Sequence, residues 1–72
     1  MIQRNKYYIQ QGYLGLEIFK VVSVDIKSNT FSAYHLYHEI DDFKQQNIWV
    51  VDFSYLNDPA QISKQDYIEY FL

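Results

Sequence analysis

LEIFKVVSVDI, residues 16–26, is the stretch that most clearly sets the fold class, because apolar and polar residues alternate along it. The even positions share an apolar face, while odd positions such as Glu17 and Asp25 are polar and point the other way. This period of two predicts a β-strand over residues 16–26. Phe19 and Val21 break the alternation, which indicates either a bulge or a strand covered on both sides.

The neighbouring segments extend this strand into an antiparallel sheet. Lys27-Ser28-Asn29 is a short polar loop of the hairpin type, so the strand-rich run TFSAYHLYH, residues 30–38, is predicted to fold back as the next strand. KYYIQ, residues 6–10, is predicted as a short edge strand. IWVVDFSYL, residues 48–56, is apolar on both faces, which predicts a strand in the centre of the sheet.

A helix with its start signals follows the last strand. Ser63 is the expected N-cap, Asp66 stands three residues later, and Ile62 and Tyr67 are spaced to pack as a hydrophobic staple. We therefore predict a short C-terminal helix over residues 64–71, docked on the sheet by its apolar stripe.

Length and composition describe a single small domain, residues 1–72. A chain of this size buries only about 60% of the surface that its unfolded form exposes, so one thin core is expected. Eight Tyr, five Phe and one Trp favour strands, while the lack of cysteine excludes disulfides and thiolate zinc sites. Stability must then come from an aromatic core or from self-association.

The same features bear on location. The start of the chain, MIQRNKYYIQQ, has no apolar leader segment, and the longest apolar run, residues 48–51, is far too short for a membrane helix. The lack of cysteine fits a reducing compartment. We expect a soluble, cytoplasmic protein.

Charge is uneven along the chain. Residues 1–36 sum to +2 and residues 37–72 to −5, for a net charge of −3. An ordinary solvated surface would account for this split. The alternative is an acidic face directed at a basic partner protein.

YHLYHE, residues 34–39, places two histidines and a carboxylate close together in the sequence. In a helix over residues 32–46, His35, His38 and Glu39 would fall within one turn. In a strand, His35 and His38 would face opposite sides, and no chelate would form. Strand propensity and the preceding hairpin turn favour a strand to His38 followed by an acidic loop over residues 39–46. We therefore expect no metal site.

Sequence motifs of catalysis are missing. The chain has no glycine-rich phosphate loop, no G-x-S-x-G and no cysteine nucleophile, and H-x-x-H-E matches no zinc protease signature. We expect no enzyme, no catalytic residues and no cofactor. Nucleic-acid binding by aromatic stacking is the alternative function, although nine acidic residues against six basic ones repel phosphate on average.

The order of strand, hairpin, strand, acidic loop, strand and capped helix resembles the small SH3-like β-barrels of short bacterial and phage proteins. The expected fold is thus mostly β, either such a barrel or a strongly bent antiparallel sheet, with one short C-terminal α-helix. The A-L-Y-D-Y pattern of signalling SH3 domains is absent, so their proline-peptide groove is not transferred. The resemblance implies a binding module.

The leading functional hypothesis is a small non-enzymatic protein-binding module that blocks a partner surface. The small size of the chain and the style of its sequence suggest that a phage or another mobile element encodes it. Inhibitors of the anti-CRISPR kind are included in this hypothesis. A nucleic-acid-associated barrel and a self-assembling structural subunit, or homo-oligomer, are the alternatives. The candidate binding residues lie at the acidic loop and on the strand before it: His35, Tyr37, Glu39, Asp41 and Asp42.

Overall fold

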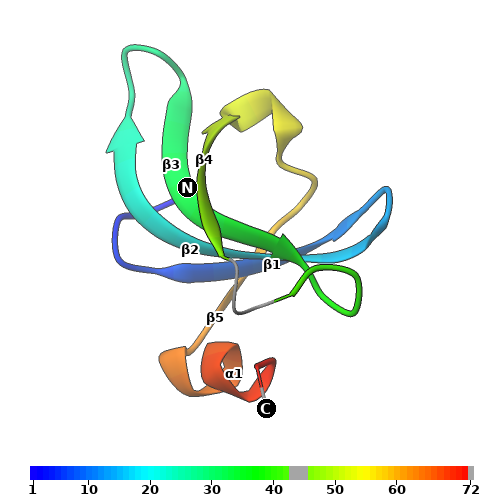
Figure 1. Cartoon of the computed structure of the whole chain (residues 1–72). Helices are drawn as coiled ribbons and strands as arrows, with labels where there is room; N and C mark the ends of the chain where they lie inside the picture. The colour runs from blue at the N-terminus through cyan, green and yellow to red at the C-terminus, as the bar shows by residue number, and fades with distance from the viewer. Residues whose placement is uncertain (43–45, 72) are drawn as a thin grey trace.

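A computed structural model describes residues 1–42 and 46–71, which form one five-stranded antiparallel sheet and one short C-terminal helix (Figure 1). In chain order the elements are β1 (Tyr7–Gly12), β2 (Gly15–Asp25), β3 (Thr30–Tyr37), β4 (Asn47–Asp52), the 3-10 helix η2 (Phe53–Tyr55), β5 (Ala60–Ile62) and α1 (Lys64–Glu69). The strand order is β4-β3-β2-β1-β5. The two outer strands do not pair with each other, so the sheet is bent but not closed into a barrel. The mostly β class with one C-terminal helix is confirmed.

The broken alternation of β2 has two structural causes. The pairing with β3 shifts between Val21 and Ser23, which is a bulge, and both faces of the strand are covered. Phe19 and Val21 pack in one core cluster, while Ile18 packs in a second cluster on the opposite face. Glu17 lies on the same face as Phe19 and is completely buried, so its predicted place on a polar outer face is wrong.

Two hydrophobic clusters cover the two faces of the sheet. The larger cluster consists of Ile2, Tyr8, Phe19, Val21, Phe31, Ala33 and Val51. The smaller one joins the sheet to α1 through Ile18, Leu36 and Tyr67. Each cluster thus keeps its own side chains from water, and α1 covers the smaller cluster on its side of the sheet.

The helix begins as its sequence predicts. The Ser63 hydroxyl accepts a hydrogen bond from the Asp66 amide at 3.0 Å, and Tyr67 is buried against the sheet with Ile62 beside it. α1 ends at Glu69, two residues before the predicted end. There the Tyr70 amide donates to the Tyr67 carbonyl at 3.2 Å, a tightened final turn that ends the regular helix.

The segment predicted as one central strand over residues 48–56 differs most from expectation. It forms β4 at the edge of the sheet and then turns, because the Asp52 carboxylate accepts a hydrogen bond from the Ser54 amide at 2.8 Å and caps η2. The chain then returns as β5, which pairs with β1 and has no counterpart in the prediction. β1 therefore lies inside the sheet, and the predicted edge position of residues 6–10 is wrong.

None of the helices in the described part of the chain has the length and hydrophobicity needed to cross a bilayer. Part of the predicted acidic loop, residues 43–45, lies outside the described residues.

Candidate functional site

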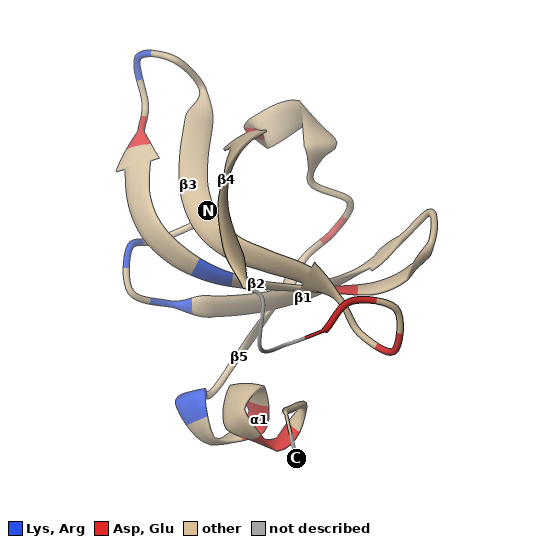
Figure 2. Ribbon diagram, in the orientation of Figure 1, with Lys and Arg blue, Asp and Glu red and all other residues tan. Residues whose placement is uncertain are grey.

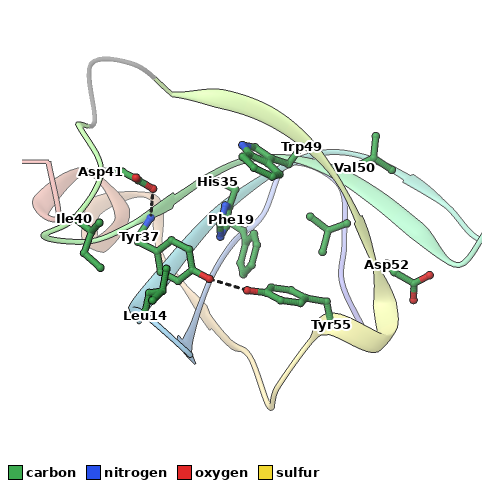
Figure 3. A pocket seen from close by; sticks show the side chains of 11 residues that line it. Leu14, Phe19, His35, Tyr37, Ile40, Asp41, Trp49, Val50, Asp52 and Tyr55 are labelled. Atoms are coloured by element: carbon green, nitrogen blue, oxygen red, sulfur yellow. Dashed lines mark hydrogen bonds between the residues drawn. The ribbon is translucent and has the colours of Figure 1, made fainter.

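An aromatic cleft of about 610 Å³ opens beside β4 (Figure 3). β2, β3, β4 and η2 all contribute to it, together with the turns after β1 and β3. Its lining consists of Leu14, Phe19, His35, Tyr37, Ile40, Asp41, Trp49, Val50, Val51, Asp52 and Tyr55. Most of these side chains are apolar or aromatic, which is the usual character of a ligand-binding cleft.

His35 is the centre of the aromatic group. Its ring stacks on Phe19, with 4.9 Å between ring centroids, and meets Tyr37 and Trp49 edge to face at 5.3 and 5.8 Å. β3 brings His35 here because it pairs with Phe19 of β2 on one side and with Asn47 of β4 on the other. The cleft wall is therefore held by ring packing and by sheet register together.

Behind the aromatic wall lies the fully buried carboxylate of Glu17. It accepts hydrogen bonds from Gln10 Nε2 at 2.8 Å, from His35 Nε2 at 2.9 Å and from the Tyr55 hydroxyl. Because the carboxylate only accepts, His35 carries a proton on Nε2. A buried charge of this kind is tolerated because donors surround it.

These hydrogen bonds decide the protonation state of Glu17. Burial alone raises the pKa of its carboxyl, but the hydrogen bonds from Gln10, Tyr55 and His35, with the Tyr37 hydroxyl close by, outweigh burial and lower the pKa below its ordinary value. Burial and the hydrogen bond to Glu17 raise the pKa of the Tyr55 hydroxyl. The Tyr55 hydroxyl thus donates its proton to Glu17, so Tyr37 is the donor in the 3.0 Å contact between the two tyrosine hydroxyls.

The first hairpin makes room for this carboxylate. A Cβ atom at Gly12 would stand 2.5 Å from Cδ of Glu17, so a larger residue would collide with the buried group. Gln10, itself buried, is fixed in turn because its Oε1 accepts a hydrogen bond from the Asn57 amide at 2.8 Å. The carboxylate therefore links β1, β2, β3 and the segment after η2.

Glu17 affects the cleft only through its hydrogen bonds to residues that line it. Its side chain has no exposed surface and three described donors occupy it, so it neither contacts a ligand nor exchanges protons with one directly. It orients His35 and, through Tyr55, the Tyr37 hydroxyl. The side chains of the cleft wall are thus held in fixed positions, with negative charge beneath them.

Three of the five predicted binding residues meet at the cleft: His35, Tyr37 and Asp41. Asp41 is held by a hydrogen bond to its Oδ2 from the Tyr37 amide at 2.8 Å. Asp42 lines a smaller adjoining hollow that also includes His35. Glu39 lies in the exposed turn after β3, with φ of 74°, and does not line the cleft.

The two histidines of YHLYHE have separate surroundings. His35 faces the cleft, whereas the His38 ring meets Tyr70 edge to face at 5.2 Å, on the side of the helix. Within residues 1–42 and 46–71, no three His, Asp or Glu side chains come close enough to hold a metal ion.

Several important residues of the site were not predicted from the sequence. Glu17, Gln10 and Tyr55 form the buried network, and Trp49 forms the upper wall of the cleft (Figure 3). A single carboxylate between Leu16 and Ile18 in an apolar run was the only available signal, and strand alternation assigned it to solvent.

Charge around the cleft has one sign. Asp41 and Asp52 lie toward opposite ends of it, and the described residues that line it include no Lys or Arg (Figure 3). The described Lys and Arg residues lie elsewhere along the backbone, on the hairpin from β2 to β3, on β2, before β1 and at the start of α1 (Figure 2). A basic ligand would therefore meet attraction at the cleft.

No family model, curated protein or solved structure matches this chain.

Proposed function

We propose that this chain is a small non-enzymatic protein-binding module whose cleft receives a basic segment of a partner protein. The observation that carries the proposal is the aromatic cleft with carboxylates at both ends. Trp49 forms one wall and is 56% exposed. Leaving so much of an apolar side chain in water forgoes the favourable free energy that its burial would contribute. Such half-exposed aromatic anchors are typical of binding surfaces.

The type of partner follows from charge. Asp41 and Asp52 attract Lys or Arg side chains, and no described basic residue at the cleft opposes them. Tyr37 and Tyr55 present large, conformationally restricted rings for the apolar parts of the partner. Electrostatic attraction raises the association rate, and ring contacts slow dissociation.

The action that fits a module without catalytic groups is to occupy a partner surface and block it. An inhibitor encoded by a phage or another mobile element, including one of the anti-CRISPR kind, is the form in which we propose this action. It requires only tight binding through one face, which an 8.7 kDa domain with one built cleft can supply.

A displayed library of random 16-residue peptides tests the proposal. We expect selected peptides to be rich in Lys or Arg and in apolar residues, and their affinity, measured by calorimetry, to fall as salt rises from about 50 to 300 mM because exposed charges are screened. Trp49→Ala should weaken binding at least about tenfold, the cost of losing an aromatic anchor. Ile26→Ala, at an exposed site on the far hairpin, is the matched control and should leave affinity unchanged.

Single-stranded DNA and RNA oligonucleotides belong in the same series of titrations. Oligonucleotide binding that Trp49→Ala abolishes, with no peptide enriched, would refute the proposal and establish nucleic acid as the ligand. Peptide binding that is indifferent to Trp49→Ala would also refute it, because the cleft would then not be the binding surface.

A further inference from the structure

The two edges of the sheet differ in how well they are protected from pairing with another chain. β5 has three residues and follows Pro59, two features that make an edge unsuitable for further pairing. β4 has six residues and contains the longest apolar run of the chain, Ile48-Trp49-Val50-Val51. An edge of that length without Lys or Pro is open to an additional strand.

The hydrogen bonds around β4 show which of its backbone groups are directed outward. The Phe53 amide donates to the Asn29 carbonyl at 2.8 Å, and the β3–β4 register continues from there without interruption. Because an antiparallel ladder alternates, Trp49 and Val51 direct their backbone groups to β3, whereas Ile48 and Val50 direct theirs away from the sheet.

The other side of β3 gives the same result independently. The His38 amide donates to the Leu16 carbonyl at 2.8 Å, so the even-numbered residues of β3 bond to β2 and the odd-numbered ones to β4. The backbone of His35 therefore hydrogen-bonds to its partner Asn47, which agrees with the odd-numbered residues of β4 bonding to β3.

The outward groups of β4 lack partners within the described chain. Among the described residues, none outside β3 forms a backbone hydrogen bond with Ile48 or Val50. In the described sheet, β3 is the only neighbour of β4. Their side chains are 55% and 72% exposed. Unpaired strand groups next to exposed apolar side chains are the structural basis of recognition by strand addition.

We propose that the partner binds by adding an extended, basic segment as a sixth strand along the free edge of β4. This inference rests on the proposed function and adds the mode of binding. Side chains of the added strand alternate between the two faces of the sheet, so those on one face lie over the cleft beside Trp49. Basic side chains of the segment then reach Asp41 and Asp52 at the two ends.

Charge favours a basic partner over a second copy of this chain. Two copies would each bring a net charge of −3 and the same cleft carboxylates to the interface. Like charges brought together weaken association, whereas a segment carrying Lys or Arg neutralises them.

Val50→Pro is the decisive variant. Proline removes the outward amide proton of Val50 but none that the β3 ladder uses, so the sheet can keep its hydrogen bonds. Val50→Thr is the matched control, because it keeps the amide and also prefers strands. Using a peptide selected from the 16-residue library, we expect Val50→Pro to weaken binding roughly tenfold more than Val50→Thr does, because both variants lose the Val50 side chain at the cleft but only proline loses the amide.

A second measurement covers the case in which Val50→Pro does not fold, as judged by circular dichroism. The selected peptide is N-methylated at alternate residues in two complementary sets and titrated against the unaltered protein. One set should abolish binding and the other should leave it nearly intact, because only every second amide of an added strand faces β4.

The outcomes separate the two proposals. Equal tolerance of both N-methylated sets, or full affinity in folded Val50→Pro, would overturn strand addition while leaving cleft binding in place. Failure to enrich any peptide would overturn both. Sedimentation equilibrium showing a dimer that Val50→Pro dissociates would overturn the basic partner and assign the edge to a second copy.

Discussion

Replacing Glu17 by Gln tests whether the buried carboxylate organises the cleft. The side chain keeps its shape, but one oxygen becomes an NH2 group and the charge is lost. In the orientation that still accepts from His35 and Tyr55, the new NH2 group faces Gln10 Nε2, so two donors oppose each other. Gln10 cannot turn its amide over without losing the bond from the Asn57 amide.

The magnitude follows from the three bonds. A hydrogen bond to a charged group contributes about 1.5–3 kcal/mol and a neutral one about 0.5–1.5 kcal/mol. One charged bond is lost and two become neutral, while the neutral amide costs less to bury. We expect the free energy of unfolding to fall by about 2–4 kcal/mol, which corresponds to a drop in Tm of roughly 10–30 °C in a domain of this size.

The assay is thermal unfolding followed by circular dichroism and by the fluorescence of Trp49, the only Trp of the chain. Glu69→Gln is the matched control. It makes the same chemical change at an exposed carboxylate on α1, and we expect it to alter stability by less than about 0.5 kcal/mol. If Glu17→Gln were as stable as Glu69→Gln, the buried network would have no organising role and the reasoning would fail.

Three further predictions follow from the same contacts. Because the folded pKa of Glu17 lies below its unfolded value, its contribution to stability is present above that unfolded pKa and is lost as pH falls through the folded pKa. In urea titrations at a series of acid pH values, the free energy of unfolding should therefore decline less steeply with falling pH in Glu17→Gln than in the unaltered protein. Gly12→Ala should lower stability by about 1–3 kcal/mol in chemical denaturation, since the added methyl group collides with a side chain that its donors hold in place. Ser63→Ala should cost about 1 kcal/mol because the Asp66 amide loses its cap, whereas Ser63→Asp should retain most of the stability.

Local patterns in the sequence were sufficient to predict the strands of the hairpin and the helix. Alternation over residues 16–26, the polar turn after it and the Ser63 cap are all short-range features, and β2, β3 and α1 formed close to their predicted ranges. His35, Tyr37 and Asp41 lie together at the cleft because the end of β3 and the following turn are adjacent in sequence, while their role in binding stays a prediction.

The remainder depended on contacts between distant residues. A strand that is apolar on both faces can be central and covered, or at an edge and exposed for a partner, and β4 is at the edge. Glu17 is separated from Tyr55 by 38 positions, and nothing local indicates that a tyrosine after β4 will bury a carboxylate of β2. Pairing of β5 with β1 likewise depends on the return of the chain after η2.

Mapping of the binding surface by NMR tests the central claim most directly. The 15N-labelled protein is titrated with a library-selected basic peptide while amide and Trp49 indole resonances are followed. We predict the largest shifts at the outward amides of Ile48 and Val50, at the Trp49 indole and at Tyr37 and Asp41, together with slowed hydrogen exchange at Ile48 and Val50. Shifts concentrated on α1 or on the hairpin from β2 to β3, with the β4 amides unchanged, would contradict binding at the cleft and its open edge.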